Sequence, residues 1–294
     1  MFVRAGHRAA GAQQAEHAKN AAGAAFRGFL TLSRILALVN QKGGVGKSTT
    51  TVNLGAALAV LGKNVLVVDL DPQGNTSTGL GINKSELKRD VYDLLMHHAA
   101  IDEVLRPTEI DNLHIIPATI NLAGAEIELV SALSRENRLK GVLATIASNY
   151  DFVLIDCPPS LGLLTINALT AAHEVIIPVQ AEYYALEGLS QLTNVVRRVQ
   201  EALNPQLHVT GVLVTMFDGR TKLAMEVLDE LNAYFPRQMF KTQIPRNVRL
   251  SEAPSFGKPV ILFDLKSRGA QAYMSLAKEM LDLYAQREAR AVAQ

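Results

Sequence analysis

The chain has 294 residues, of which 48% are hydrophobic and 19% are charged, and its formal net charge is +1. This length and apolar content suffice for one large α/β domain or two small ones, so we expect a folded protein. The single cysteine, Cys157, excludes an internal disulfide framework and a metal site built from the cysteines of one chain, which favours the cytoplasm. The sequence contains no run of about 18 apolar residues, so no membrane-spanning helix is predicted.

Charge is distributed unevenly along the chain. The formal net charge is +4 over residues 1–34, −7 over 35–196 and +4 over 197–268, with as many acids as bases in 269–294. A DNA partner, if there is one, would be sought where Lys and Arg gather, because binding without sequence preference relies on cations against phosphates. The first 34 residues and the C-terminal third are those places.

Residues 1–33 are rich in Ala, Gly, Gln, His and Arg and show no sustained apolar face. This pattern predicts a disordered N-terminal extension. A start rich in Arg and poor in acids is also typical of an organelle transit peptide, and a bacterial tail or a start codon chosen too far upstream explains it equally. We therefore place the folded domain at residues 34–294.

From Ile35 onward, short β-type runs alternate with longer helical ones. Strands are predicted at 35–39, 64–70, 113–118, 151–157, 174–179 and 209–215, and helices at 48–61, 126–148, 186–202 and 222–233. Several of the strands are apolar throughout, as expected when helices cover both faces of a parallel sheet. The pattern predicts the α/β class, with a single doubly wound, mainly parallel sheet flanked by helices.

A glycine-rich loop, KGGVGKST, follows the first predicted strand directly and opens a helix. Glycines let the backbone curl so that successive N–H groups point at phosphate oxygens, and the N-terminus of the helix attracts the same charge. Lys47 is placed to hold the β- and γ-phosphates of a nucleotide and Ser48 to ligate Mg²⁺. The expected nucleotide-binding residues of the loop are Gly43, Gly44, Val45, Gly46, Lys47, Ser48 and Thr49.

The loop contains a second lysine, Lys42, which exceeds what one nucleotide needs. We interpret Lys42 as reaching a nucleotide held by a partner subunit. The alternative is a solvated loop lysine.

Three aspartates stand at the ends of predicted strands. Asp69 and Asp71 are two residues apart, so both carboxylates can face the crevice at the carboxyl edge of the sheet. One would support the magnesium shell while the other positions or deprotonates water. Asp156 ends the otherwise apolar strand segment that precedes it and is placed to hold magnesium through a water.

Five segments occur in an order that is specific to one family. They are KGGVGKST, DLDPQGNTSTGLG, DFVLIDCPPSLG, TMFDGRTKLAMEV and IPRNVRLSEAPSFGKPV. Together they resemble the ParA/Soj chromosome and plasmid partitioning ATPases, within the MinD/ParA class of deviant Walker A P-loop proteins. The resemblance runs from about Ile35 to the C-terminal helix.

The resemblance implies an ATPase whose cofactors are ATP and Mg²⁺. It implies that Lys42 crosses the interface of an ATP sandwich dimer, that Lys47 binds phosphate and that Ser48 ligates magnesium. Asp71 would activate water, with Asp69 and Asp156 supporting the metal.

The later segments imply further contacts. Arg220 and Arg249 match family positions that bind DNA without sequence preference, and surface ion pairs are the alternative role for both. The segment 245–248 matches the lining of the adenine pocket, so Pro245 and Arg246 are expected base contacts.

The implied function is an ATP-driven switch in DNA segregation. The ATP-bound homodimer would bind nonspecific double-stranded DNA, and slow hydrolysis, stimulated by a ParB-like partner, would release it. The protein would be cytoplasmic and associated with the nucleoid.

Two related functions remain as alternatives, and a third is excluded. A MinD-like membrane-cycling ATPase should end in a basic amphipathic helix, but the terminal segment is charge-balanced, so its apolar stripe is expected to pack on the sheet. A ParA-like positioning ATPase for another cargo also stays open. A reductase like the nitrogenase iron protein needs two cysteines per subunit and is excluded.

Overall fold

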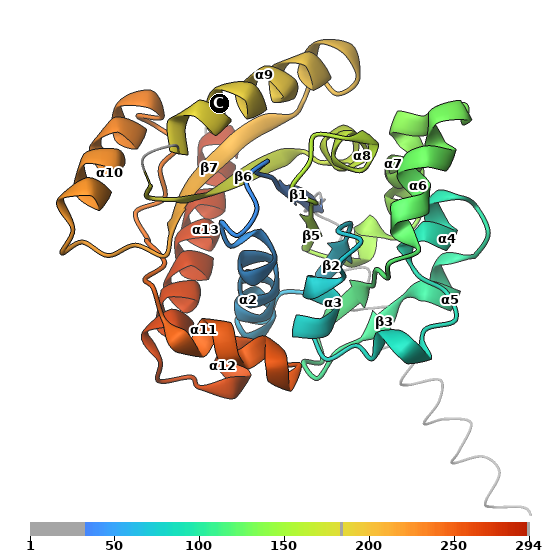
Figure 1. Cartoon of the computed structure of the whole chain (residues 1–294), viewed down its shortest axis with the longest axis horizontal. Helices are drawn as coiled ribbons and strands as arrows, with labels where there is room; N and C mark the ends of the chain where they lie inside the picture. The colour runs from blue at the N-terminus through green and yellow to red at the C-terminus, as the bar shows by residue number, and fades with distance from the viewer. Residues whose placement is uncertain (1–32, 183–184, 293–294) are drawn as a thin grey trace, which may run out of the picture. The chain divides into compact units, whose positions relative to one another are not determined.

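A seven-stranded sheet forms the centre of the fold (Figure 1). The computed structural model describes residues 33–182 and 185–292, so the expected extension at 1–33 lies outside the described part except for Ser33. The strand order is β3-β4-β2-β5-β1-β6-β7, and every neighbouring pair is parallel except β3 with β4. The strands are β1 (Arg34–Leu38), β2 (Val65–Asp69), β3 (Arg106–Pro107), β4 (Leu113–Ile116), β5 (Phe152–Asp156), β6 (Glu174–Gln180) and β7 (His208–Thr215).

Helices cover both faces of this sheet, which confirms the doubly wound prediction. They are α2 (Lys47–Val60), α3 (Asn75–Gly79), α4 (Val91–Leu95), α5 (Ile101–Val104), α6 (Leu122–Glu128), α7 (Arg138–Ala144), α8 (Leu163–Ala171), α9 (Ala185–Ala202), α10 (Lys222–Tyr234), α11 (Val248–Glu252), α12 (Val260–Phe263) and α13 (Arg268–Val292). In β1, Leu36 and Leu38 join the core beneath α2 and α13, whereas Ile35 and Ala37 join the core on the opposite face. Burial on both sides explains why the strands read as continuous apolar runs.

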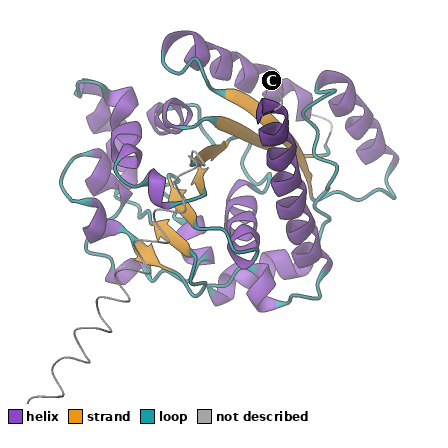
Figure 2. Ribbon diagram, turned by 180° about the vertical axis from the view of Figure 1, so that it is seen from behind, coloured by secondary structure: helices purple, strands orange, loops and turns teal. Residues whose placement is uncertain are grey.

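The long C-terminal helix α13 lies beside α2, and both cover one face of the sheet (Figures 1 and 2). Its apolar stripe is buried, with Tyr273, Leu276 and Met280 each at most 1% exposed. Tyr273 also shares a hydrogen bond of 3.1 Å with the Thr50 hydroxyl of α2. The stripe is therefore part of the hydrophobic core, as the sequence predicts.

Two predicted features differ from the structure. The helix expected at 126–148 is broken into α6, short 3-10 turns and α7, because Ser134 adopts a left-handed conformation with φ 51° that an α-helix cannot accommodate. The sequence analysis also missed β3, an antiparallel edge strand of two residues that includes Pro107. A strand this short has no periodicity to detect.

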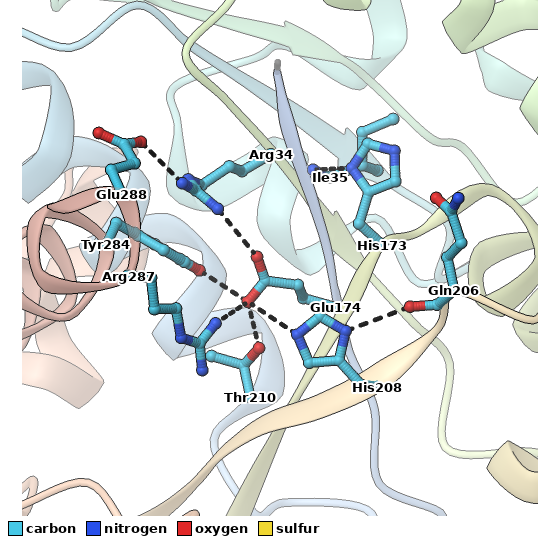
Figure 3. Close-up of polar contacts among 10 residues, drawn as sticks. All are labelled: Arg34, Ile35, His173, Glu174, Gln206, His208, Thr210, Tyr284, Arg287 and Glu288. Atoms are coloured by element: carbon cyan, nitrogen blue, oxygen red, sulfur yellow. Dashed lines mark hydrogen bonds and ion pairs between the residues drawn. The ribbon is translucent and has the colours of Figure 1, made fainter. Parts of the chain in front are cut away.

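A buried carboxylate, that of Glu174, lies at the amino ends of the neighbouring strands β1, β6 and β7 (Figure 3). Glu174 is 3% exposed and lies 3.5 Å from an Arg34 nitrogen and 3.3 Å from an Arg287 nitrogen. Tyr284 and Thr210 donate their hydroxyls to the same carboxylate. The Arg34 guanidinium stacks 3.9 Å from the centre of the Tyr284 ring. These contacts join the start of three strands to the C-terminal half of α13.

We predict that Glu174→Gln lowers the free energy of unfolding by about 2 kcal/mol, because it removes the buried negative charge that faces the guanidinium groups of Arg34 and Arg287. Urea unfolding at neutral pH measures this change. The matched control is Glu226→Gln, which removes an exposed carboxylate 3.3 Å from Lys222 and should cost less than about 0.5 kcal/mol. Equal effects of the two substitutions would contradict a stabilising role for the buried cluster.

Candidate nucleotide site

The glycine-rich loop between β1 and α2 has the backbone that phosphate binding requires. Gly44 and Gly46 have φ values of 74° and 87°, a left-handed conformation that favours glycine. Gly46 is the N-cap of α2, and its carbonyl accepts the first helical hydrogen bond, from Thr50 N at 2.9 Å. The Thr215 hydroxyl at the end of β7 donates to the Val45 carbonyl at 2.8 Å. The loop is thus held open above a 14-residue helix whose N-terminus faces the site.

Lys47 begins α2 and is only 6% exposed. Its Nζ donates to the Lys42 carbonyl at 3.3 Å. Burial lowers the pKa of Lys47, and the nearby carboxylate of Asp156 opposes that shift. This contact is the one acceptor of the ammonium within residues 33–182 and 185–292, and a buried ammonium so weakly engaged is suited to bind an anion.

Asp156, at the end of β5, has one oxygen occupied and one unpartnered. Its Oδ2 accepts the Thr76 hydroxyl at 2.7 Å, whereas its buried Oδ1 has no hydrogen-bond partner among residues 33–182 and 185–292. Burial raises the pKa of Asp156, and the nearby hydroxyls of Thr76 and Ser48 oppose the rise. An unpartnered buried carboxylate oxygen next to a serine hydroxyl fits a hard divalent cation or its water.

Asp69, at the end of β2, is paired in register with Asp156 on β5. Its Oδ2 accepts both the backbone N–H and the hydroxyl of Ser77, at 2.8 and 2.7 Å, and its Oδ1 accepts Asp71 N at 3.1 Å. Burial and the neighbouring charge of Asp156 raise the pKa of Asp69. Both oxygens therefore hold the chain that follows β2 in place.

Asp71 lies at the start of that chain and is 7% exposed. Its Oδ1 accepts the Gln73 backbone N–H at 2.9 Å, and a tight turn closes with Gly74 N donating to the Asp71 carbonyl at 2.8 Å. Gly74 has φ 62°, and a Cβ there would lie 2.7 Å from the Ala118 carbonyl oxygen. The close packing fixes the Asp71 carboxylate at the rim of the cavity described next.

One cavity of about 620 Å³ collects most of the predicted nucleotide residues. It is lined by Gly43, Gly44, Gly46, Lys47, Ser48, Thr49, Asp71, Pro245 and Arg246, together with Asn247, Met216 and others. Val45 is buried below the loop and contributes its carbonyl to Thr215 instead. Pro245 is held in place because Phe217 N donates to the Ile244 carbonyl at 2.9 Å, next to a bridge between Phe217 and Pro245.

Lys42 lies outside the lining of this cavity, within the part of the chain that the structure describes. It lines a neighbouring cavity of about 530 Å³ instead, and its Nζ is 2.7 Å from Glu182 Oε2. The two lysines of the loop therefore point to different places.

The two arginines expected to bind DNA lie far apart in the sequence, and each forms ion pairs with acidic side chains. Arg220 lies in the turn before α10, is 90% exposed and forms a bidentate pair with Asp218 at 2.6 and 2.8 Å. Arg249 lies on α11 and contacts Glu252 at 2.8 Å and Asp264 at 3.3 Å. A cavity of about 660 Å³ adjoins the nucleotide cavity, shares Pro245 and Arg246 with it, and is also lined by Arg220.

Sequence reasoning missed the hydroxyl groups that hold the strand-end carboxylates. Thr76 and Ser77 are fully buried and donate to Asp156 and Asp69 respectively. The signal for them was the run NTST, which begins four residues after Asp71. Cys157, which directly follows β5, is fully buried, and burial raises the pKa of its thiol well above the usual value.

Comparison with known proteins identifies the family. A family model described as an AAA domain matches residues 33–209. The sporulation initiation inhibitor protein Soj of Bacillus subtilis (strain 168) is 60% identical over 249 residues, which cover 85% of this chain and 98% of that protein. The chain belongs to the ParA/Soj family of partitioning ATPases.

Further similarities agree with this assignment. The chromosome partitioning protein ParA of Myxococcus xanthus (strain DK1622) is 52% identical, covering 87% of this chain and 90% of that protein. Among solved structures, a cobyrinic acid a,c-diamide synthase from Mycobacterium smegmatis with bound ADP and magnesium has a TM-score of 0.76 at 38% identity, covering 86% and 96% of the two chains. As a ParA/Soj family member, the chain is an ATPase whose cofactors are ATP and Mg²⁺.

We predict that Lys47→Ala weakens ATP binding by about 10- to 100-fold, because the variant loses a hydrogen bond between charged groups in a buried site. Titration with a fluorescent ATP analogue measures the dissociation constant. Lys63→Ala, which removes a lysine from the turn after α2, serves as the control and should bind with the affinity of the wild type. An unchanged affinity in Lys47→Ala would exclude this loop as the phosphate site.

Proposed function

We propose that this ATPase is a DNA-segregation switch whose ATP-bound form is a homodimer on nonspecific DNA and whose hydrolysis, stimulated by a ParB-like partner, ends that state. The observation that carries the proposal is that the two lysines of the loop lie at different cavities. Lys47 occupies the subunit's own cavity, while Lys42 is directed outside it. A lysine beside the cavity but not in it is suited to reach a nucleotide on a second subunit.

Nucleotide binding would use the backbone of residues 43–46, the N-terminus of α2 and the ammonium of Lys47. Mg²⁺ would be held by Ser48 and by Asp156 through Oδ1, which has no partner in the described part of the chain, and when bound it neutralises charge on the phosphate oxygens. Asp69 would support that arrangement through Ser77 and the backbone of Asp71, to which it is hydrogen-bonded. Pro245 and Arg246 line the cavity from its other side, where the base would lie.

Hydrolysis would depend on Asp71. Its carboxylate lines the nucleotide cavity and accepts the Gln73 backbone N–H, and its own backbone N–H donates to Asp69. A carboxylate so held orients a water molecule and accepts its proton during attack on the γ-phosphate. Slow turnover follows if dimerisation is needed to complete the site, as the position of Lys42 suggests.

DNA binding would use Arg220 and Arg249. Their acidic partners do not prevent it, because exposed ion pairs contribute little and a phosphate competes with them for a guanidinium. The excess of basic residues in 197–268 supports the same surface. Dimerisation would double the number of these arginines on one particle, and the DNA-bound protein would be cytoplasmic and associated with the nucleoid.

The membrane-cycling alternative has less support. None of the described helices is long and apolar enough to cross a membrane. The apolar stripe of α13, which a MinD-like protein would need for docking on lipid, is buried against α2 and the sheet. Positioning of another cargo by the same switch stays as the second candidate, because nothing in the ATP site depends on the cargo.

We predict that Asp71→Ala binds ATP but hydrolyses it at least about 100-fold more slowly, because it lacks the proton acceptor. In ATP the variant should sediment as a stable dimer that co-sediments with duplex DNA, whereas in ADP it should remain a monomer without DNA. Analytical ultracentrifugation with and without DNA measures both. DNA binding that is equal in ADP and ATP would contradict the switch.

We predict that Arg220→Ala and Arg249→Ala each weaken binding to duplex DNA of any sequence and reduce the salt dependence of binding. Because each substitution removes two charges from the proposed dimer, the slope of log K against log salt should become less negative by up to about 1.8. Arg197→Ala is the control, since Arg197 is also exposed and lies on α9, away from α11 (Figure 1). Equal losses in all three variants would show that net charge, not this surface, governs DNA binding.

A further inference from the structure

The second lysine of the loop has a defined partner on its own subunit. Lys42 Nζ lies 2.7 Å from Glu182 Oε2, and the two side chains are 42% and 45% exposed. Glu182 follows β6, and its backbone N–H donates to the Gln180 carbonyl at 2.8 Å. We propose that Glu182 is a positioning residue that holds Lys42 on its own subunit in the monomer and gives it up when Lys42 reaches the partner's nucleotide. The inference rests on the dimer role proposed for Lys42.

The backbone around the pair is fixed, so the side chain of Lys42 is the part able to change partner. Lys42 N donates to Asn40 Oδ1 at 2.9 Å, and Asn40 in turn donates its amide to the Pro178 carbonyl on β6 at 2.8 Å. Gln41 donates to the Gly188 carbonyl on α9 at 3.3 Å. Hydrogen bonds therefore join the start of the glycine-rich loop to β6 and α9, which flank Glu182. This arrangement places the side chains of Lys42 and Glu182 next to each other.

Electrostatics explain why Lys42 needs a partner away from its own cavity. That cavity already holds the buried ammonium of Lys47. Inside it, Lys42 would have to compete with Lys47 for the carboxylates of Asp156 and Asp71, which already act on the Lys47 ammonium. Glu182 provides a carboxylate outside the cavity, so the Lys42 side chain has a defined position before dimerisation.

The solvent exposure of the Lys42–Glu182 ion pair limits how much it can weaken dimerisation. Exposed ion pairs shift an equilibrium by about 1.5- to 5-fold. Each dimer breaks two such pairs, one from each subunit, so Glu182 should weaken ATP-dependent dimerisation by about 2- to 30-fold. A triphosphate forms stronger charge-assisted contacts than one solvated carboxylate and displaces it. The pair is thus strong enough to bias the monomer and weak enough to be released.

The first experiment compares Glu182→Gln with its parent in a chain that also carries Asp71→Ala, so that ATP is retained. Sedimentation equilibrium in ATP should show dimerisation that is about 2- to 30-fold tighter in Glu182→Gln, with both proteins monomeric in ADP. The matched control is Glu201→Gln on α9, whose carboxylate is 69% exposed and lies 4.0 Å from Arg197. It removes the same charge without touching Lys42 and should leave the dimerisation constant unchanged.

The second experiment tests the pair itself in the otherwise wild-type chain with ADP. Brief acetylation followed by mass spectrometry measures the reactivity of each lysine amine. Glu182→Gln should raise the reactivity of Lys42 at least about 1.5-fold, while Lys63 and Lys84 react as before, and Glu201→Gln should change none of them. Unchanged Lys42 reactivity, or dimerisation that is unchanged or weaker in Glu182→Gln, would overturn the proposal.

A separate variant distinguishes this inference from the function on which it rests. Lys42→Gln should abolish dimerisation in ATP while retaining nucleotide binding. If Lys42→Gln dimerises like its parent, the proposed role of Lys42 fails and the role of Glu182 fails with it. If Lys42→Gln stays monomeric and Glu182→Gln behaves like its parent, only the positioning role of Glu182 is refuted.

Discussion

Two fully buried carboxylates, Asp69 and Asp156, lie in register on neighbouring strands, and the architecture of the nucleotide site follows from the need to accommodate them. Burial and the charge of Asp156 raise the pKa of Asp69, and buried like charges destabilise a fold unless donors or cations surround them. Thr76 and Ser77 supply donors from α3, and Lys47 supplies a cation from α2. The segment after β2 is therefore needed to stabilise the sheet as well as to form the nucleotide site.

This arrangement links the parts that act on a nucleotide. Asp69 uses both oxygens to hold Ser77 and the Asp71 backbone, so the residue proposed to activate water is fixed by a carboxylate that does not itself line the cavity. Asp156 keeps one oxygen without a protein partner in the described part of the chain, and that oxygen is suited to a metal ion. The sequence predicts all three aspartates at strand ends, but they take different structural roles. Those roles depend on which hydrogen-bond donors contact each carboxylate.

Much of the fold was predictable from the sequence, because strands buried on both faces read as apolar runs and the glycine loop has a fixed place between strand and helix. The positions of Lys47 and Asp71 at one cavity follow from the same rules. The break at Ser134 was not predictable, since a left-handed serine has no compositional signal. The hydroxyl donors Thr76 and Ser77, and the Glu182 partner 140 residues from Lys42, depend on how distant segments pack. Periodicity along one chain carries no information of that kind.

The burial of Cys157 has a practical consequence. It is the only cysteine in the sequence, it is fully buried behind the site, and its thiol pKa is raised well above the usual value. Thiol reagents act on accessible thiolates, so the native folded chain behaves toward them as if it contained no cysteine. A cysteine introduced on the surface would accept a dye as a single label without removal of the native residue. Fluorescence could then follow the association of two subunits in real time, with the strand end that carries Cys157 left intact.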